Sequence, residues 1–385
     1  MKPETRVAGW REVERVELQG EPALAQRLRE VLEMTGREDR LTHGFHTYPA
    51  GLHPDAARTL LEIVGGTSVF DPFCGGGTVL VEAMTLGRAA VGCDVSPVAN
   101  LVARTRTLVW QPELISRMRS WGRRIADMGR EWTELPHDAT AMKVREWYEA
   151  HVGRELEGLR HGIGQAPEEV RLPLWCAFSS ILIKVSLRAS DTSQQKVLIH
   201  REPGTTAILF HKKVRELGRR LEDLAASVPP GTPPAEIWAG DARSLKPSLP
   251  VDAIVTSPPY PAVYDYVPLQ ALRVAWMNLD DEQARAVEIG PRRAFRADRT
   301  AAMQRWRRDL GNWTRTAADT LRPGGRMAVV IGDGNALDTP VDSLSTLIEE
   351  GRRAGFVPVA RASGDRMDLG SKVPRREHVL LLERK

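Results

Sequence analysis

Hydrophobic and polar positions alternate between two kinds of pattern from residue 55 to about residue 110. Short apolar runs rich in β-branched and small residues predict strands in "TSVFDPF" and "RAAVGCDVSP". Longer segments next to glycines predict helices in "DAARTLLEIVGG", "GGTVLVEAMTLG" and "VANLVARTRTLV". Strand, glycine turn, helix and strand form a βαβ unit, which predicts a parallel sheet with right-handed crossovers.

The pattern becomes helical between about residues 111 and 235, and this segment closes on the proline-rich "VPPGTPPAE". Strand-like runs then return in "EIWAGDARSL", "VDAIVTSPPY", "GGRMAVVIGDG" and "EHVLLLER", with helices predicted in "TAADTLRPGG" and "SLSTLIEEGRRAGF". We therefore expect an α/β fold with one doubly wound sheet and a mostly helical insertion. The expected parts are a polar segment at 1–54 that ends in a docking loop, a sheet domain from 55–110 and 236–385, and the insertion at 111–235.

The composition indicates the protein's cellular environment more clearly than its function. Lys plus Arg exceed Asp plus Glu by 54 to 50, a mildly basic balance that is compatible with a nucleic-acid partner. The three cysteines show no metal or disulfide spacing, so we expect no metal site and a reducing, cytoplasmic environment. The charged start of the chain, and the lack of any run of eighteen apolar residues, predict a soluble protein without a signal peptide or membrane span.

Acidic residues follow three successive predicted strands, and glycines follow the first. In "VFDPFCGGGTVLVEA" the glycines allow a ligand to approach the backbone, and no Walker lysine follows, so the ligand need not carry a phosphate. Asp94 suits the two hydroxyls of a ribose, Asp241 an adenine amino group, and Asp71 an ammonium group. Each feature alone is also typical of a structural turn or a helix cap. Together they predict a pocket for a nucleoside that carries a charged amine.

The strand "VDAIVT" ends in Ser257, Pro258, Pro259 and Tyr260. The prolines fix φ and hold their carbonyls in a rigid turn. The serine adds a hydroxyl acceptor, and the tyrosine a flat ring. An exocyclic amino group on a planar base requires such acceptors and such a stacking surface. The alternative is a strand-ending turn with a packed tyrosine.

"DPFCGGGT" together with "TSPPY" resembles the paired motifs of the amino-directed nucleic-acid methyltransferases, which use S-adenosylmethionine. "HTYPAGLHP", "GCDVSP", "LRPGGRMAVVIGDG" and "REHVLLLERK" are similar to segments of bacterial DNA methylases of the N4-cytosine or N6-adenine type. The resemblance covers about residues 44 to 110 and 236 to 385, and it implies a Rossmann-like methyltransferase sheet. It also implies a cofactor pocket and a catalytic tetrapeptide. The implied cofactor residues are Tyr48, Asp71, Phe73, Gly75, Gly77, Asp94 and Asp241, and the implied catalytic residues are Ser257, Pro258, Pro259 and Tyr260.

Serine at the first position of the tetrapeptide is similar to the N4-cytosine enzymes, since N6-adenine enzymes usually carry Asp or Asn there. We therefore expect direct methyl transfer to N4 of a flipped-out cytosine in DNA. Gly51 stands where relatives carry a lysine, which leaves the role of the "YPA" loop open. An adenine-N6 enzyme, an RNA methyltransferase acting on guanine N2 or adenine N6, and a non-catalytic nucleic-acid-binding protein remain alternatives.

Arginines cluster downstream of the tetrapeptide, where they suit phosphate binding unless they form a solvated helix face. The members of this arginine cluster are Arg285, Arg292, Arg293, Arg296, Arg299, Arg305, Arg307 and Arg308. Of these, Arg292, Arg293, Arg296 and Arg299 are the predicted substrate-binding members. Tyr264, Asp265 and Tyr266 are predicted to line the base pocket. The expected partner is DNA, with RNA not excluded, and a restriction endonuclease is a possible companion.

Overall fold

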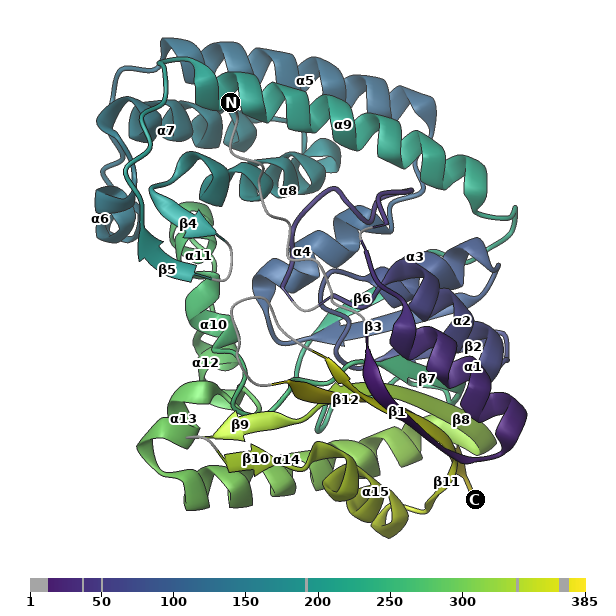
Figure 1. Cartoon of the computed structure of the whole chain (residues 1–385). Helices are drawn as coiled ribbons and strands as arrows, with labels where there is room; N and C mark the ends of the chain where they lie inside the picture. Colours follow the sequence, from purple (N-terminus) through teal and green to yellow (C-terminus); the bar gives the residue numbers. More distant parts are fainter. Residues whose placement is uncertain (1–12, 37, 50, 191–192, 337–338, 367–373) are drawn as a thin grey trace.

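The computed structural model describes residues 13–36, 38–49, 51–190, 193–336, 339–366 and 374–385. Their main feature is an eight-stranded sheet with the strand order β1-β11-β12-β8-β7-β2-β3-β6 (Figure 1). Its strands are β1 Glu14–Gly20, β2 Ser68–Asp71, β3 Ala89–Asp94, β6 Glu236–Ala239, β7 Val251–Thr256, β8 Leu321–Gly332, β11 Phe356–Arg366 and β12 Arg375–Arg384. The α/β fold with a doubly wound, Rossmann-like sheet is confirmed.

The order of the strands reverses between β2 and β7. From β2 the chain winds outward through β3 to β6, and then returns to β7 and β8 on the other side, all in parallel pairs. β12 pairs antiparallel with β8 and with β11. In open α/β sheets ligands bind outside the carboxyl ends of the strands at such a reversal. The fold therefore points to the ends of β2 and β7, where Asp71 and Thr256 lie.

Alternate residues of the strands enter two different cores, because successive side chains in a strand point to opposite faces. Val69 and Ala253 pack on one face, and Phe70 and Ile254 on the other. The first face is covered by α1 Pro22–Glu33, α2 Pro54–Val64 and α3 Thr78–Thr85, and the second by α14 Arg299–Thr320 and α15 Ser343–Arg353 (Figure 1).

A mostly helical unit with its own core lies above the sheet in Figure 1, beyond α4 Pro97–Arg106. α11 Ala271–Met277, which follows the tetrapeptide, packs its Trp276 into this core, so the helical unit is joined to the strand ends of the sheet. The unit comprises α5 Pro112–Glu131, α6 Ala139–Val144, the 3-10 turn η1 Arg145–Trp147, α7 Ala150–Gln165, α8 Glu168–Val185, β4 Arg188–Ser190, β5 Ser193–Lys196 and α9 Thr205–Ser227. Short elements complete the chain, namely α10 Tyr266–Leu269, α12 Glu282–Val287, α13 Arg292–Ala297, β9 Gly334–Ala336 and β10 Thr339–Val341.

The edge of the sheet and the start of β8 differ from the sequence prediction. Residues 14–33, expected only as a polar segment, form β1 and α1, and β1 pairs antiparallel with β11 at the edge of the sheet. The "LRPGG" sequence, expected at a helix end, already belongs to β8 because α14 ends at Thr320. Within the described ranges, no helix has the length and apolar character needed to cross a membrane.

Candidate active site

Asp71 lies at the end of β2, where it joins the two central strands. Its Oδ1 accepts hydrogen bonds from Thr256 Oγ1 on β7 at 2.7 Å and from the Phe73 backbone N–H at 3.1 Å. The residue is only 3% exposed. Among the residues that the structure describes, no side chain or backbone group bonds its Oδ2. One oxygen therefore fixes the carboxylate, while the other is left for a ligand.

The glycine turn follows Asp71 and is closed by Asp94 from the end of β3. Asp94 Oδ2 accepts the Gly75 N–H at 3.0 Å, and its Oδ1 accepts the Ser96 N–H at 2.8 Å. Gly75 and Gly77 have φ of +49° and +78°, a region that side chains rarely adopt. A Cβ on Gly77 would also meet Ala103 of α4 at 3.1 Å. Gly75 thus faces the cavity, whereas Gly77 allows close helix packing.

The carboxyls of Asp71 and Asp94 line one cavity, and no basic side chain among the described residues forms an ion pair with either of them. Burial raises the pKa of Asp71 to about 7, the charge of Asp94 adds to the increase, and the bonds from Thr256 and Phe73 oppose it. Burial likewise raises the pKa of Asp94 to about 6 against its bonds to Ser96 and Gly75. Uncompensated acids in a cavity favour a ligand with positive charge and hydroxyl donors.

Asp241 follows β6 and lines the same cavity, but it already has a strong partner. Both of its carboxylate oxygens accept from the Arg243 guanidinium, the shortest contact being 2.6 Å. Arg243 also donates to Asp309 Oδ1 at 2.6 Å, so one arginine bridges two acids. Asp241 therefore offers a ligand only the lone pairs that Arg243 leaves. The sequence analysis did not identify this arginine.

The tetrapeptide Ser257 to Tyr260 forms the opposite wall of the cavity. Tyr260 is held on several sides: its hydroxyl donates to Glu377 Oε1 of β12 at 3.0 Å. The Arg375 guanidinium lies over its ring at 5.3 Å from the centroid. A Cβ on Gly332 would lie 2.7 Å from its Cε2. The ring is thus fixed by the ends of β8 and β12.

A strap formed by residues 38 to 48 passes beside the glycine turn. Arg106 at the end of α4 donates to the carbonyls of His43 at 2.6 Å and His46 at 2.5 Å, and to the Gly76 carbonyl at 3.0 Å. A Cβ on Gly76 would meet this guanidinium at 2.7 Å. Tyr48, at the end of the strap, lies 3.4 Å from where a Gly75 Cβ would be and lines the cavity.

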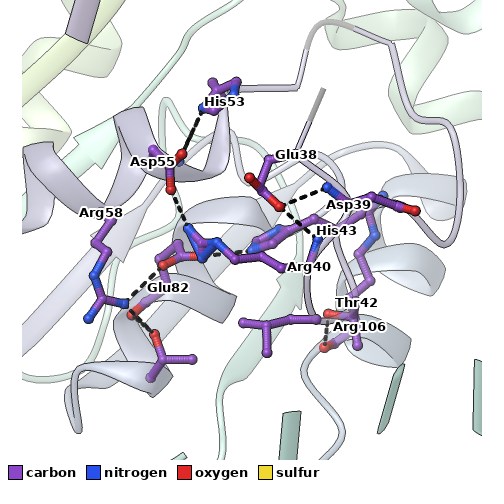
Figure 2. A network of polar contacts seen from close by, with 12 residues as sticks. Glu38, Asp39, Arg40, Thr42, His43, His53, Asp55, Arg58, Glu82 and Arg106 are labelled. Carbon is purple, nitrogen blue, oxygen red and sulfur yellow. Dashed lines mark hydrogen bonds and ion pairs between the residues drawn. The ribbon is translucent and has the colours of Figure 1, made fainter. Parts of the chain in front are cut away.

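The strap is also tied to α3 by a buried acid. Glu82 is fully buried, and its carboxylate lies 2.9 Å from Arg40 Nη1 and 2.7 Å from His43 Nε2 (Figure 2). Arg58 of α2 approaches its second oxygen at 3.3 Å. Sequence analysis missed Glu82 and Arg106. Glu82 is a charged residue inside an otherwise apolar helical run, which is a signal of a buried partner, whereas Arg106 ends α4 next to Arg104 and Thr105 and gives no such signal.

The predicted base-pocket residues are only partly brought together. Tyr266 lines the cavity. The centroid of the Tyr264 ring lies 5.5 Å from the centroid of the Tyr266 ring. Asp265 instead accepts the Arg293 backbone N–H at 2.9 Å and lies 3.7 Å from Arg292 Nε. The structure thus assigns Asp265 a clear structural partner at the start of α13.

Some members of the arginine cluster form ion pairs within the chain, and others do not. Ion pairs within the chain engage Arg285 with Asp281, Arg292 with Asp265, Arg293 with Glu288, Arg305 with Asp309, and Arg307 with Glu349 and Glu350. Arg296, Arg299 and Arg308 are exposed and form no ion pair within the described part of the chain. These three are the members free to meet a phosphate.

The described residues hold no group of three His, Cys, Asp or Glu side chains placed for a metal ion. Cys74, Cys93 and Cys176 are free and buried, as expected for packed residues. The single cavity at the strand reversal is lined by Tyr48, Asp71, Phe73, Gly75, Asp94, Asp241, Ser257, Pro258, Pro259, Tyr260 and Tyr266.

Known proteins similar to this chain are methyltransferases. Residues 45–113, which include the end of the strap, the glycine turn and Asp94, match the model of the RMKL-like methyltransferase domain. The type II methyltransferase M.MvaI of Kocuria varians is 26% identical over 275 residues, 63% of this chain and 59% of the relative. M.BsoBI of Geobacillus stearothermophilus is 19% identical over 291 residues, 67% and 57% respectively.

A shorter match connects the chain to RNA modification. The tRNA (guanine(10)-N2)-dimethyltransferase of Methanothermobacter thermautotrophicus is 39% identical over 51 residues, 12% of this chain and 15% of the relative. The chain spans less than three fifths of the length of the two type II relatives. The matches support a methyltransferase domain in this chain.

Proposed function

We propose that the chain transfers a methyl group from S-adenosylmethionine to an exocyclic amino group of a DNA base, with cytosine N4 as the preferred position. One observation carries this proposal. Two uncompensated carboxylates and the Ser257 to Tyr260 turn face the same cavity at the strand reversal. The acids suit a cationic nucleoside, and the turn suits an amino group on a planar ring.

The donor set fits this cofactor, which supplies an activated methyl group on a sulfonium centre. Asp71 Oδ2 would accept from its ammonium group, and Asp94 would accept from the ribose hydroxyls. Gly75 and Gly76 permit close approach of the backbone. Tyr48, on the strap, would cover the cofactor on the side of the glycine turn.

The base is held by the opposite wall. Ser257 Oγ and the Pro258 carbonyl would accept the two amino hydrogens and draw the nitrogen out of conjugation with the ring, because an amino nitrogen that is conjugated is a weak nucleophile. The Tyr260 ring would stack on the base with the face opposite to Arg375. The amino nitrogen would bond to the methyl carbon as the bond between that carbon and the sulfonium sulfur breaks, which would release S-adenosylhomocysteine, and the nitrogen would then lose a proton to solvent, without a covalent enzyme intermediate.

DNA is favoured over RNA by the extent of the matches, because the two type II relatives match over most of this chain and the tRNA enzyme over 51 residues. That shorter match supports an RNA guanine-N2 methyltransferase as the second candidate. A base in a duplex must leave the stack before it can reach the turn. Arg296, Arg299 and Arg308 supply positive charge that would hold the flanking phosphates. A restriction endonuclease as a companion belongs to this proposal as well.

Radiolabelled S-adenosylmethionine tests the activity directly. Purified protein should label unmethylated bacterial DNA more than total RNA, and Ser257→Ala should abolish most of the labelling while cofactor binding persists. Labelling of RNA alone would favour the second candidate. Binding of both ligands without any labelling would favour a non-catalytic nucleic-acid-binding protein.

A further inference from the structure

Arg243 lies between two acids in the loop after β6 and does not itself line the cavity. Its Nε lies 3.0 Å from each carboxylate oxygen of Asp241, and its Nη2 donates to Asp241 Oδ2 at 2.6 Å. Its Nη1 donates to Asp309 Oδ1 of α14 at 2.6 Å. The exposed fractions of these side chains are 15% for Arg243, 18% for Asp241 and 6% for Asp309. The guanidinium is therefore held mostly away from solvent, where charged hydrogen bonds are strong.

The backbone of Arg243 is fixed as well. Its N–H donates to Asp241 Oδ1 at 2.9 Å, and its carbonyl accepts the Thr316 hydroxyl of α14 at 2.7 Å. The guanidinium also donates from Nη2 to the Val287 carbonyl at the end of α12, at 3.2 Å. Val287 lines the cavity, as Asp241 does. One arginine thus ties the loop after β6 to α12 and α14.

The hydrogen bonds from Arg243 occupy most of the acceptor positions of Asp241. A carboxylate offers about four lone-pair positions. Three hydrogens of Arg243 fill them, namely the backbone N–H, the Nε–H that is shared between the two oxygens, and one hydrogen of Nη2. No other group in the described ranges donates to this carboxylate. About one acceptor position is left on a side chain that lines the cavity.

We propose that Arg243 is a positioning residue that commits the Asp241 carboxylate to one hydrogen bond from the adenine amino group of the cofactor, and so selects adenine over a base with an oxygen at that position. This inference rests on the proposed function and deepens it, because it names what holds the adenine acceptor in place. An ionised carboxylate and the oxygen of hypoxanthine are both acceptors only. If the carboxylate is held rigidly, the two oxygens face each other without a hydrogen, and such a mismatch rejects an analogue strongly.

S-adenosylhomocysteine and S-inosylhomocysteine test this selection without methyl transfer, because they differ in the amino group of the base and the adjacent ring nitrogen. Titration calorimetry of the wild type should give dissociation constants that differ by about 10-fold or more in favour of adenine, the range for a hydrogen bond to a charged group. Arg243→Lys keeps a cation between Asp241 and Asp309, but a single ammonium lacks the fork that binds both oxygens. In this variant the ratio should fall to about 3-fold, because the carboxylate can turn away from the oxygen of hypoxanthine.

Arg305→Lys is the matched control. Arg305 also approaches Asp309, with its Nε 3.7 Å from Oδ2, and it also donates to α12, at the Ala286 carbonyl, at 3.1 Å. Within the described structure it forms no hydrogen bond or ion pair with Asp241. The control should keep the wild-type ratio of dissociation constants. An equal loss of the ratio in Arg305→Lys and Arg243→Lys would assign the effect to Asp309 or α12 and overturn the proposal.

Asp241→Asn tests the acceptor itself. Its amide can donate to the hypoxanthine oxygen, so the ratio should fall to about 1 or reverse. Thermal unfolding of every variant separates a role in stability from a role in selection. If Arg243→Lys lowers the melting temperature but keeps the wild-type ratio, Arg243 only stabilises the fold and the proposal is wrong.

These outcomes also separate the inference from the proposed function. If the wild type binds neither ligand, the proposed function fails and the inference fails with it. If the wild type binds both ligands equally, the cofactor site stands and only the inference is rejected. If the wild type discriminates between the ligands and Arg243→Lys does not, the inference holds even where no nucleic acid is methylated.

Discussion

Burial destabilises the ionised form of the Asp71 carboxyl, and a cationic ligand can offset this effect. Asp71 is a buried carboxyl whose folded-state pKa, about 7, lies above its ordinary value of 3.8. Its contribution to stability is therefore fully present below about pH 4 and is lost as the pH rises through 7. A cationic ligand reverses this, because it favours the ionised form. A strained acid of this kind is typical of a binding site.

Asp71→Asn should stabilise the cofactor-free protein at pH 8 by about 2 kcal/mol, because the amide is neutral at every pH. Its Oδ1 can still accept from Thr256 and Phe73. Thermal unfolding of both proteins between pH 4 and pH 8 measures the effect, and the difference should shrink toward pH 4. Calorimetry should show that the same variant loses most of its affinity for S-adenosylmethionine. A variant less stable than the wild type at pH 8 would contradict the assignment.

At the scale of secondary-structure elements, the strap is held in place by residues of α4 and α3. Arg106 uses its guanidinium to bind two strap carbonyls and the glycine turn, so the position of Tyr48 depends on a residue that does not line the cavity. Glu82 anchors the same strap from α3. Because the matched domain model begins at residue 45, part of the strap lies within it.

Arg106→Met should lower the affinity for S-adenosylmethionine about 10-fold or more, since three buried carbonyls lose their donor. Arg104→Met is the control on the same helix, because Arg104 donates to the Ile237 carbonyl on β6 instead. Calorimetric binding and thermal unfolding should be measured for both. Equal affinities in the two variants would mean that the strap does not hold the cofactor site.

The sequence predicted the elements that carry periodic apolar patterns, and with them the positions of Asp71 and Asp94 at the ends of strands. β2, β3, β7 and the glycine turn were placed correctly, because buried parallel strands are continuous apolar runs. β1 was missed because it is an edge strand of seven residues in which only Val16 and Leu18 are large and apolar. Arg243, Glu377 and Arg106 were missed for another reason, since their roles come from partners distant in sequence that no local pattern records.

At the scale of the whole molecule, the chain after Tyr260 first joins the helical unit through α11 and then carries the exposed arginines. α11 packs into the helical core directly after the turn, and α13 and α14 follow with the exposed Arg296 and Arg299. A nucleic acid that delivers a base to Tyr260 would therefore pass close to these arginines. The paired members of the cluster are committed to ion pairs within the chain, so the number of phosphate contacts is smaller than the sequence implies.

Reversing Arg296 and Arg299 to Glu should weaken DNA binding equally for all sequences, and the slope of log affinity against log salt should fall by about 2, one unit for each lost phosphate contact. Arg352→Glu, at an exposed arginine on α15, is the control. Fluorescence anisotropy at several salt concentrations measures both. An unchanged slope would assign the cluster to a solvated helix face.

Mass spectrometry of nucleosides from DNA and RNA treated with the protein and S-adenosylmethionine tests the central claim most directly. The account predicts N4-methylcytosine in DNA from the wild type and almost none from Tyr260→Ala. Methylation only at a ring carbon, or equal methylation by Tyr260→Ala, would contradict an amino-directed site at Ser257 to Tyr260.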